Sequence, residues 1–86
     1  MNMSFGEALI FLKSGKTLTR ENWNGKNIGV YLYIPLSRSM TNEQLSANSY
    51  IMPHFRIWDK DKKTVNSWVP SISDILENDW MILDDF

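Results

Sequence analysis

One set of apolar residues recurs near the start of the chain at the spacing of a helical face: Phe5, Ala8, Leu9 and Leu12. Ser4 and Glu7 have the S-x-x-E spacing of a capping box, which marks the beginning of a helix. Gly15 follows at a position where glycine commonly ends a helix. The pattern predicts an amphipathic helix between Ser4 and Gly15 whose apolar stripe covers one face of a sheet.

The clearest strand pattern lies in residues 28–36, which read I-G-V-Y-L-Y-I-P-L. Two sets of side chains would point to opposite faces, the aliphatic Val30, Leu32 and Ile34 on one and the aromatic Tyr31 and Tyr33 on the other. The helix can cover the aliphatic face. A further strand is predicted for residues 16–23; it ends at Trp23, before an Asn-Gly turn. The tyrosines then form either an ordinary amphipathic surface or, together with Trp23, a stacking wall.

Residues 50–58 and 64–69 predict a hairpin whose strands are joined by the charged turn D-K-D-K-K. Pro53 cannot donate a ladder hydrogen bond, so it predicts an edge strand or a bulge. His54 and Arg56 would share one face of this strand, where they would suit an anionic ligand or form an exposed polar pair.

Residues 37–49 form a polar segment, with a possible single turn of helix at 42–47. Loops of this length in a small domain are uncommon unless they serve as a lid or a contact surface. We therefore predict a surface excursion, whose use the sequence leaves open.

Residues 68–80 read W-V-P-S-I-S-D-I-L-E-N-D-W, and the rest of the chain is organised around this segment. Ser71 and Asp74 have capping-box spacing, and Pro70 stiffens the entry to the helix that they predict. Three residues would form an apolar stripe closing a small core: Ile72, Ile75 and Leu76. Asn78 is predicted to end this helix in the left-handed conformation, before a last strand that includes Trp80.

Together these elements predict a single α+β domain over residues 1–86, with a small antiparallel sheet of about five strands. The N-terminal helix packs on one face of the sheet, and a short helix lies near the C-terminus. A chain of 86 residues has a thin core, yet it contains four Trp, four Phe and three Tyr residues. These rings must fill that core or line a concave surface, and such small domains often oligomerise.

Charge and composition exclude several classes of function. The net charge of −1 comes from interleaved signs, so no basic track indicates binding to duplex nucleic acid. There is no cysteine and only one histidine, His54, which excludes a Cys/His zinc site, and we expect neither a metal nor a cofactor. No apolar run approaches a membrane span and no signal-peptide pattern is present, so we expect a soluble protein inside the cell.

Catalytic patterns are missing, whereas residues suited to recognition are plentiful. Asp74 and Asp79 are five apart and do not share a helical face, so a hydrolase that uses them has no positive support. Candidate recognition residues offer rings at Trp23, Tyr31, Tyr33 and Trp68, polar tips at Asn24, Ser71 and Asp74, and cations at Arg20, His54 and Arg56. This set suits a nucleotide, because rings stack on a base, carboxylates or amides accept from sugar hydroxyls, and arginine binds phosphate.

Five motifs in order along nearly the whole chain resemble a known family: F-G-E-A-L-x-x-L-K-x-G-K, R-x-N-W-N-G-K, G-V-Y-L-Y, P-H-F-R-I-W and the C-terminal segment from Trp68. The chain is similar to the small phage-encoded Thoeris anti-defence proteins of the second type. The resemblance implies a non-enzymatic sponge that acts in the cytoplasm of the infected host. Such a protein binds a cyclic ADP-ribose-type (glycocyclic ADP-ribose) immune signal and keeps it intact and away from the Thoeris effector.

The resemblance also implies a homo-oligomer, a tetramer built from dimers, with ligand pockets where subunits meet; some relatives also bind cyclic dinucleotides. Pocket candidates in the matching motifs are Trp23, Asn24, Trp68, Pro70, Ser71 and Asp74, with Tyr31, Tyr33, His54 and Arg56 as further ligand-binding candidates. Residues 37–50 match no family motif, which leaves the choice of ligand open. The alternative is an oligomeric interaction or structural module without a nucleotide ligand.

Overall fold

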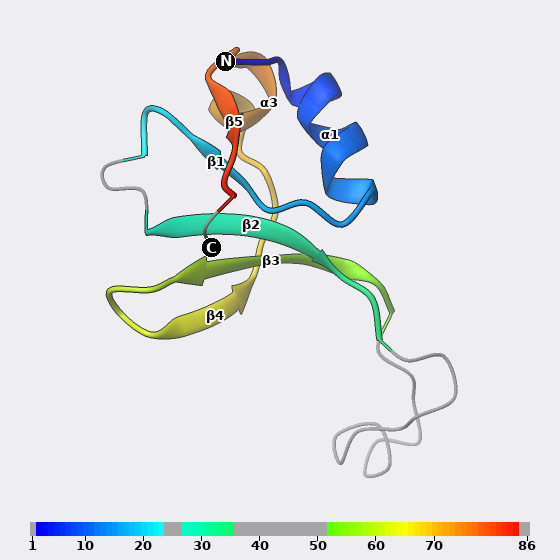
Figure 1. Ribbon diagram of the computed structural model, residues 1–86, viewed down its shortest axis with the longest axis vertical. Helices are drawn as coiled ribbons and strands as arrows, with labels where there is room; N and C mark the ends of the chain where they lie inside the picture. The colour runs from blue at the N-terminus through cyan, green and yellow to red at the C-terminus, as the bar shows by residue number, and fades with distance from the viewer. Residues whose placement is uncertain (1, 24–26, 36–51, 85–86) are drawn as a thin grey trace, which may run out of the picture.

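The computed structural model describes residues 2–23, 27–35 and 52–84, which form two helices and one five-stranded antiparallel sheet (Figure 1). The elements in chain order are α1 (Phe5–Lys13), β1 (Leu18–Arg20), β2 (Ile28–Tyr33), β3 (His54–Asp59), β4 (Thr64–Ser67), α3 (Ile72–Leu76) and β5 (Trp80–Ile82). The strands lie side by side in the order β4-β3-β2-β1-β5. The predicted α+β fold is confirmed.

Helix α1 begins and ends where the sequence predicts. The Ser4 hydroxyl accepts a hydrogen bond from the Glu7 backbone N–H at 3.2 Å, and a Glu7 carboxylate oxygen accepts from the Ser4 N–H at 3.1 Å. Gly15 follows the helix with a φ of 97°, a backbone conformation that favours glycine. The helix is therefore fixed at both ends by its own sequence.

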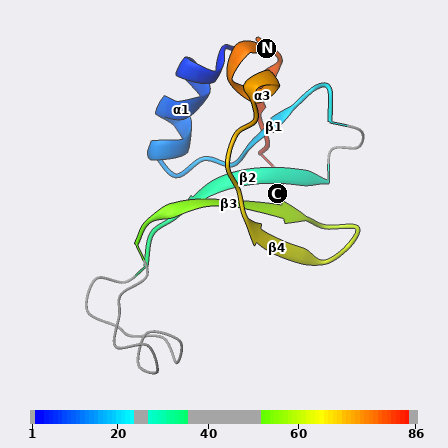
Figure 2. The same cartoon turned by 180° about the vertical axis from the view of Figure 1, so that it is seen from behind.

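The core lies between α1 and the sheet. Its fully buried apolar residues come from α1, β1, β2 and β5: Ala8, Leu12, Leu18, Val30 and Trp80. In the two opposite views, α1 and α3 lie side by side at one end of the molecule, away from the β3–β4 hairpin (Figures 1 and 2). The core is small, and half-buried aromatic rings extend it at its margin.

The strand register divides the side chains of the sheet between two faces. Leu18 pairs with Val30, and Val30 pairs with Ile57, so these residues share the face that α1 covers. On the opposite face, Tyr31 pairs with Arg56, Tyr33 with His54, and Trp58 with Val65. This second face, which carries Tyr31, Tyr33, His54, Arg56, Trp58 and Val65, is called the open face below.

Several local predictions are wrong. Ile34 does not join the aliphatic face, because β2 ends at Tyr33 and Ile34 is 64% exposed. Pro53 does not mark an edge strand or a bulge: it immediately precedes β3, which lies between β4 and β2, so no ladder hydrogen bond is lost. Asn78 is not left-handed, since α3 ends at Glu77 in an extended conformation and only Gly15 and Lys63 have positive φ among the described residues.

The remaining strands are shorter than predicted. Strand β1 covers three residues of the predicted 16–23, and β3 begins at His54 within the predicted 50–58. The predicted Asn-Gly turn at 24–25 and the helical turn at 42–47 lie outside the described residues.

The apolar stripe of α3 does not close the core. Ile72 is 77% exposed, Ile75 49% and Leu76 70%, and the neighbouring Val69 is 84% exposed. With 3.6 residues per turn, the side of the helix opposite Ile72 and Leu76 carries Asp74, which is buried. Asp74 forms an ion pair with Arg20, whose Nη1 lies 2.8 Å from Asp74 Oδ1. This ion pair holds Asp74 inward, so the apolar residues of α3 face outward. Val69, Ile72, Ile75 and Leu76 are called the α3 apolar patch below.

Candidate functional site

Three tryptophans from separate parts of the chain meet at the margin of the core. Trp23 and Trp68 are half-buried, and each packs edge-on against the fully buried Trp80, with ring centroids 5.4 Å and 6.0 Å from it. The rings of Trp23 and Trp68 are 6.3 Å apart with an interplanar angle of 79°. This tryptophan cluster therefore offers two partly exposed rings that pack on a buried third ring, which suits stacking on a planar group.

An arginine links the segments that carry these rings. The Arg20 side chain is 5% exposed; its Nε donates to Asp79 Oδ1 and its Nη1 to Asp74 Oδ1, each at 2.8 Å. Asp74 Oδ2 accepts from the Ser71 N–H at 2.8 Å, and Asp79 Oδ2 accepts from the Asn22 N–H at 3.0 Å. This Arg20 clamp, made of Arg20, Asp74 and Asp79, therefore engages all four carboxylate oxygens in protein hydrogen bonds.

The clamp favours the charged form of each member. The hydrogen bond to Asp79 raises the pKa of Arg20 above its ordinary value, although burial acts in the opposite direction. Burial opposes ionisation of Asp74, yet hydrogen bonds from Ser71 and Arg20 lower its pKa. The pKa of Asp79 is likewise lowered by Arg20 and the Asn22 N–H, despite burial. Neither carboxyl group is thereby suited to hold a proton for general-acid catalysis.

The predicted capping box at α3 is confirmed, and it links Ser71 to Asp74 of the clamp. The Asp74 N–H donates to the Ser71 hydroxyl at 3.2 Å, while the Asp74 carboxylate binds the Ser71 N–H. The Trp80 indole N–H donates to the Asp74 carbonyl at 2.8 Å. Pro70 is half-buried and Ser71 is exposed beside these contacts. Asp74 thus has a structural role here, and direct contact of Pro70, Ser71 or Asp74 with a ligand stays a prediction.

On the open face, a guanidinium group is held over an aromatic ring. Arg56 Cζ lies 3.7 Å from the centroid of the Tyr33 ring, and Arg56 Nε donates to His54 Nε2 at 3.1 Å. His54 Nδ1 lies 2.8 Å from the Met52 carbonyl oxygen, so Nδ1 carries the proton and Nε2 is the acceptor. The terminal amino groups of Arg56 make no hydrogen bond within the described residues and can bind an anion.

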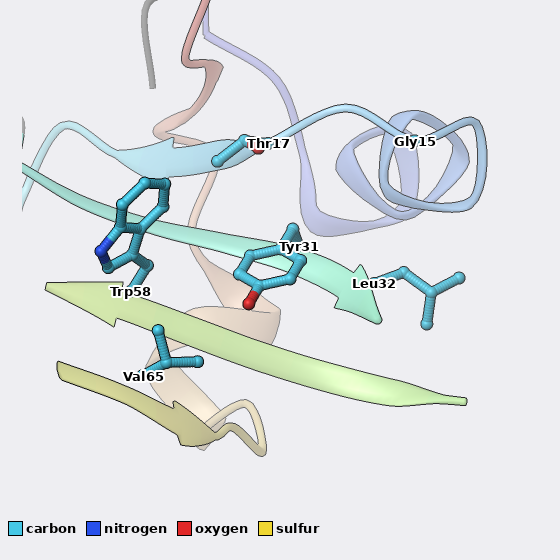
Figure 3. A pocket seen from close by; sticks show the side chains of 6 residues that line it. All are labelled: Gly15, Thr17, Tyr31, Leu32, Trp58 and Val65. Carbon is cyan, nitrogen blue, oxygen red and sulfur yellow. The ribbon is translucent and has the colours of Figure 1, made fainter. Parts of the chain in front are cut away.

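A hollow of about 350 Å³ lies beside this arginine on the sheet. It is lined by residues of β2, β3, β4 and the segment that follows α1: Gly15, Thr17, Tyr31, Leu32, Trp58 and Val65. Figure 3 shows Tyr31, Trp58 and Val65 rising from three neighbouring strands on the same side of the sheet. Tyr31 pairs with Arg56 across the ladder, so the hollow and the cation belong to one continuous surface.

The structure divides the sequence-predicted site residues into two groups on opposite sides of the sheet. Trp23, Trp68, Pro70, Ser71 and Asp74 lie with the tryptophan cluster and the clamp, whereas Tyr31, Tyr33, His54 and Arg56 lie on the open face. Asn24 lies outside the described residues. The stacking wall that would join Trp23 to the tyrosines is therefore not formed within one chain.

Two features are not predicted from the sequence: the Arg20 clamp and the position of Trp58 in the lining of the hollow. Helical spacing does not bring Asp74 and Asp79 together, but both converge on Arg20, one from a helix and the other from a loop. Arg20 lies next to buried strand positions, and a buried arginine requires carboxylate partners, which is the signal that could have found them. Trp58 lies two residues after Arg56 in the same strand, so strand alternation places both side chains on one face. This alternation is the signal in the sequence that could have predicted the position of Trp58.

Two classes of site are absent from the part of the chain that the structure describes, residues 2–23, 27–35 and 52–84. In this part of the chain, no group of three or more His, Cys, Asp or Glu side chains is arranged to hold a metal ion. Neither α1 nor α3 has the length and apolar character of a membrane-spanning helix.

Comparison with known proteins agrees with the resemblance noted in the motifs. The family model for the Thoeris anti-defense 2-like domain matches residues 3–83. The protein Thoeris anti-defense 2 of Bacillus phage SP01 is 39% identical over 87 residues, an alignment that covers 94% of this chain and 94% of the relative. The match includes both the tryptophan cluster and the open face. The chain therefore belongs to the Thoeris anti-defense 2-like family of anti-defence proteins.

Proposed function

We propose that this protein binds a cyclic ADP-ribose-type signalling nucleotide, glycocyclic ADP-ribose, and sequesters it without degrading it, so that the Thoeris effector is not activated. The observation that carries the proposal is Arg56, whose guanidinium is held over Tyr33 beside a hollow walled by aromatic rings. The guanidinium suits a phosphate of the ligand, and the rings of Tyr31 and Trp58 suit a base. The protein acts in the cytoplasm of the infected bacterium, where such a signal is made.

The chemistry of the described site supports binding rather than turnover. Asp74 and Asp79 are the carboxylates that a hydrolase hypothesis would use, and all four of their oxygens bind Arg20 or backbone N–H groups. Their lowered pKa values keep them ionised and engaged near neutral pH. His54 also has both ring nitrogens in hydrogen bonds. A ligand held on the open face therefore meets stacking and charge, and the ligand is expected to leave unchanged.

We further propose that the binding unit is a homo-oligomer, a tetramer as the resemblance implies. Two features support this proposal. The α3 apolar patch exposes large aliphatic side chains, which soluble proteins commonly cover at an interface. The two groups of site residues also lie on opposite sides of one sheet, so one ligand can contact both only between copies. Arg56 of one copy and Trp68 of another would then bind the same nucleotide.

Calorimetric titration of the purified protein with glycocyclic ADP-ribose tests the proposed function. We expect saturable heat with a Kd below about 1 µM, because a protein that sequesters a scarce signal must bind it tightly. AMP serves as the control ligand, since it offers a base and a phosphate without the cyclic shape. Equal affinity for AMP and glycocyclic ADP-ribose would contradict recognition of the cyclic signal.

The exposed α3 apolar patch favours one alternative, an oligomeric interaction or structural module that has no nucleotide ligand. Under this alternative, titration with glycocyclic ADP-ribose and with cyclic dinucleotides gives no heat of binding, while the oligomer forms as before.

A further inference from the structure

The Arg20 clamp joins two parts of the chain that are distant in sequence and that each carry one half-buried tryptophan. Trp23 ends a turn whose backbone is held twice: the Trp23 N–H donates to the Arg20 carbonyl at 3.0 Å, and the Asn22 N–H donates to the Asp79 carboxylate at 3.0 Å. The turn is thus held by the main chain of Arg20 and by the carboxylate of Asp79, whose other oxygen accepts from the Arg20 side chain.

The second tryptophan is connected to the clamp from the other side. Trp68 lies three residues before Ser71, whose N–H donates to the Asp74 carboxylate at 2.8 Å. The Trp68 N–H donates to the Phe55 carbonyl at 2.9 Å, so this segment is anchored at one end to β3 and at the other to the clamp. A single planar guanidinium therefore connects the segments that carry Trp23 and Trp68.

We propose that Arg20 and Asp79 are positioning residues for the ligand: the clamp sets the mutual orientation of the Trp23 and Trp68 rings, so that their exposed parts are preorganised for stacking. This inference rests on the proposed function for the part that concerns the ligand. Buried charge is a costly way to stabilise a fold, because apolar residues of similar size often serve equally well. A geometric role accounts for the use of two carboxylates on one arginine.

Asp79→Asn is the sharpest test of this role. Asparagine has the same shape, but its amide nitrogen cannot accept a hydrogen bond. If its oxygen accepts from Arg20, the Asn22 N–H faces an N–H₂ group and loses its acceptor; after an amide flip, Arg20 loses its acceptor instead. One end of the clamp is therefore released while the side-chain volume is kept. Arg20→Lys is the second variant, since lysine keeps the charge but not the planar fork.

Two readouts measure the positioning role. The first needs no ligand: near-UV circular dichroism reports the mutual orientation of the coupled indole rings, and we expect Asp79→Asn and Arg20→Lys to change this signal while far-UV circular dichroism stays that of the folded protein. The second is the Kd for glycocyclic ADP-ribose, measured well below the melting temperature of each variant. We expect affinity to fall about tenfold, which corresponds to about 1.4 kcal/mol.

Glu77→Gln is the matched control, because Glu77 is an exposed acidic residue at the end of α3. It should leave both readouts unchanged. If the variants lower the melting temperature but keep the near-UV spectrum and the Kd of the wild type, the clamp only stabilises the fold and the inference is overturned. If the wild-type protein does not bind glycocyclic ADP-ribose, the proposed function fails, while the near-UV spectra still decide whether the clamp orients the rings.

Discussion

Replacing two residues of the α3 apolar patch tests whether copies of this chain assemble through it. Ile72 is 77% exposed and Leu76 is 70% exposed, so each has most of its side chain available to a partner. Burying a side chain of this size contributes about 1.5 to 3 kcal/mol, and at these exposures about 1 to 2 kcal/mol remains to be gained. The double variant Ile72→Ser, Leu76→Ser removes this gain.

The expected effect on assembly is large. The two substitutions cost about 2 to 4 kcal/mol per copy, and both copies contribute at a two-fold interface, so the association constant falls roughly 10³-fold to more than 10⁵-fold. In contrast, the folded single chain should change in stability by no more than about 0.5 kcal/mol, because these side chains touch little within it. Size-exclusion chromatography with light scattering, run over a range of concentrations, measures the assembly.

Ile34→Ser is the matched control, because Ile34 is 64% exposed and lies beyond the end of β2, away from the patch. The control should assemble like the wild type, while the double variant dissociates at micromolar concentration. A double variant that keeps the wild-type mass at every concentration would show that the patch is not an interface. A wild-type protein that is monomeric throughout would refute the proposed oligomer itself.

Three further predictions concern the core, the clamp and the open face. Leu12→Ala should lower the free energy of unfolding by about 2 to 5 kcal/mol in urea titrations, because Leu12 is fully buried in a small core; a loss below 1 kcal/mol would mean that α1 packs loosely. The ionised forms of Asp74 and Asp79 contribute stability that is fully present above their ordinary pKa of 3.8 and is lost as the pH falls through their lowered values. The stability difference between the wild type and Asp79→Asn, followed by thermal melts, should therefore shrink below about pH 3.8, and a difference that grows there would contradict the sign. Arg56→Gln should weaken binding of glycocyclic ADP-ribose by about 10- to 100-fold in calorimetry, since a hydrogen bond to a charged group contributes about 1.5 to 3 kcal/mol; unchanged affinity would remove Arg56 from the site.

Most of the fold could be predicted from local sequence rules. The capping boxes at Ser4 and Ser71, the stop at Gly15 and the alternation in residues 28–33 each depend on neighbouring residues, and the structure has all of them. The left-handed end predicted at Asn78 is wrong, because a helix of five residues can end in an extended conformation without a left-handed residue.

The orientation of α3 could not be predicted in this way, because two features favour opposite orientations of the helix. The apolar stripe would turn Ile72, Ile75 and Leu76 toward the core, whereas the ion pair with Arg20 turns Asp74 toward it. Asp74 reaches Arg20 across 54 positions of sequence, and a pattern within the helix does not reveal this partner. The ion pair turned Asp74 inward and Ile72 outward. The same long-range geometry separates Trp68 from Arg56, since strand pairing decides which face each side chain occupies.

We propose that this protein holds a cyclic nucleotide without changing it, and this proposal can be tested in one experiment. The most direct measurement mixes the oligomer with a substoichiometric amount of glycocyclic ADP-ribose, confirms that the free ligand is depleted, denatures the protein by heat, and identifies the released nucleotide by mass spectrometry. We expect depletion of the free ligand before heating and full recovery of the intact cyclic molecule afterward. Recovery of a linear or otherwise altered product, or a free ligand concentration that never falls, would contradict it.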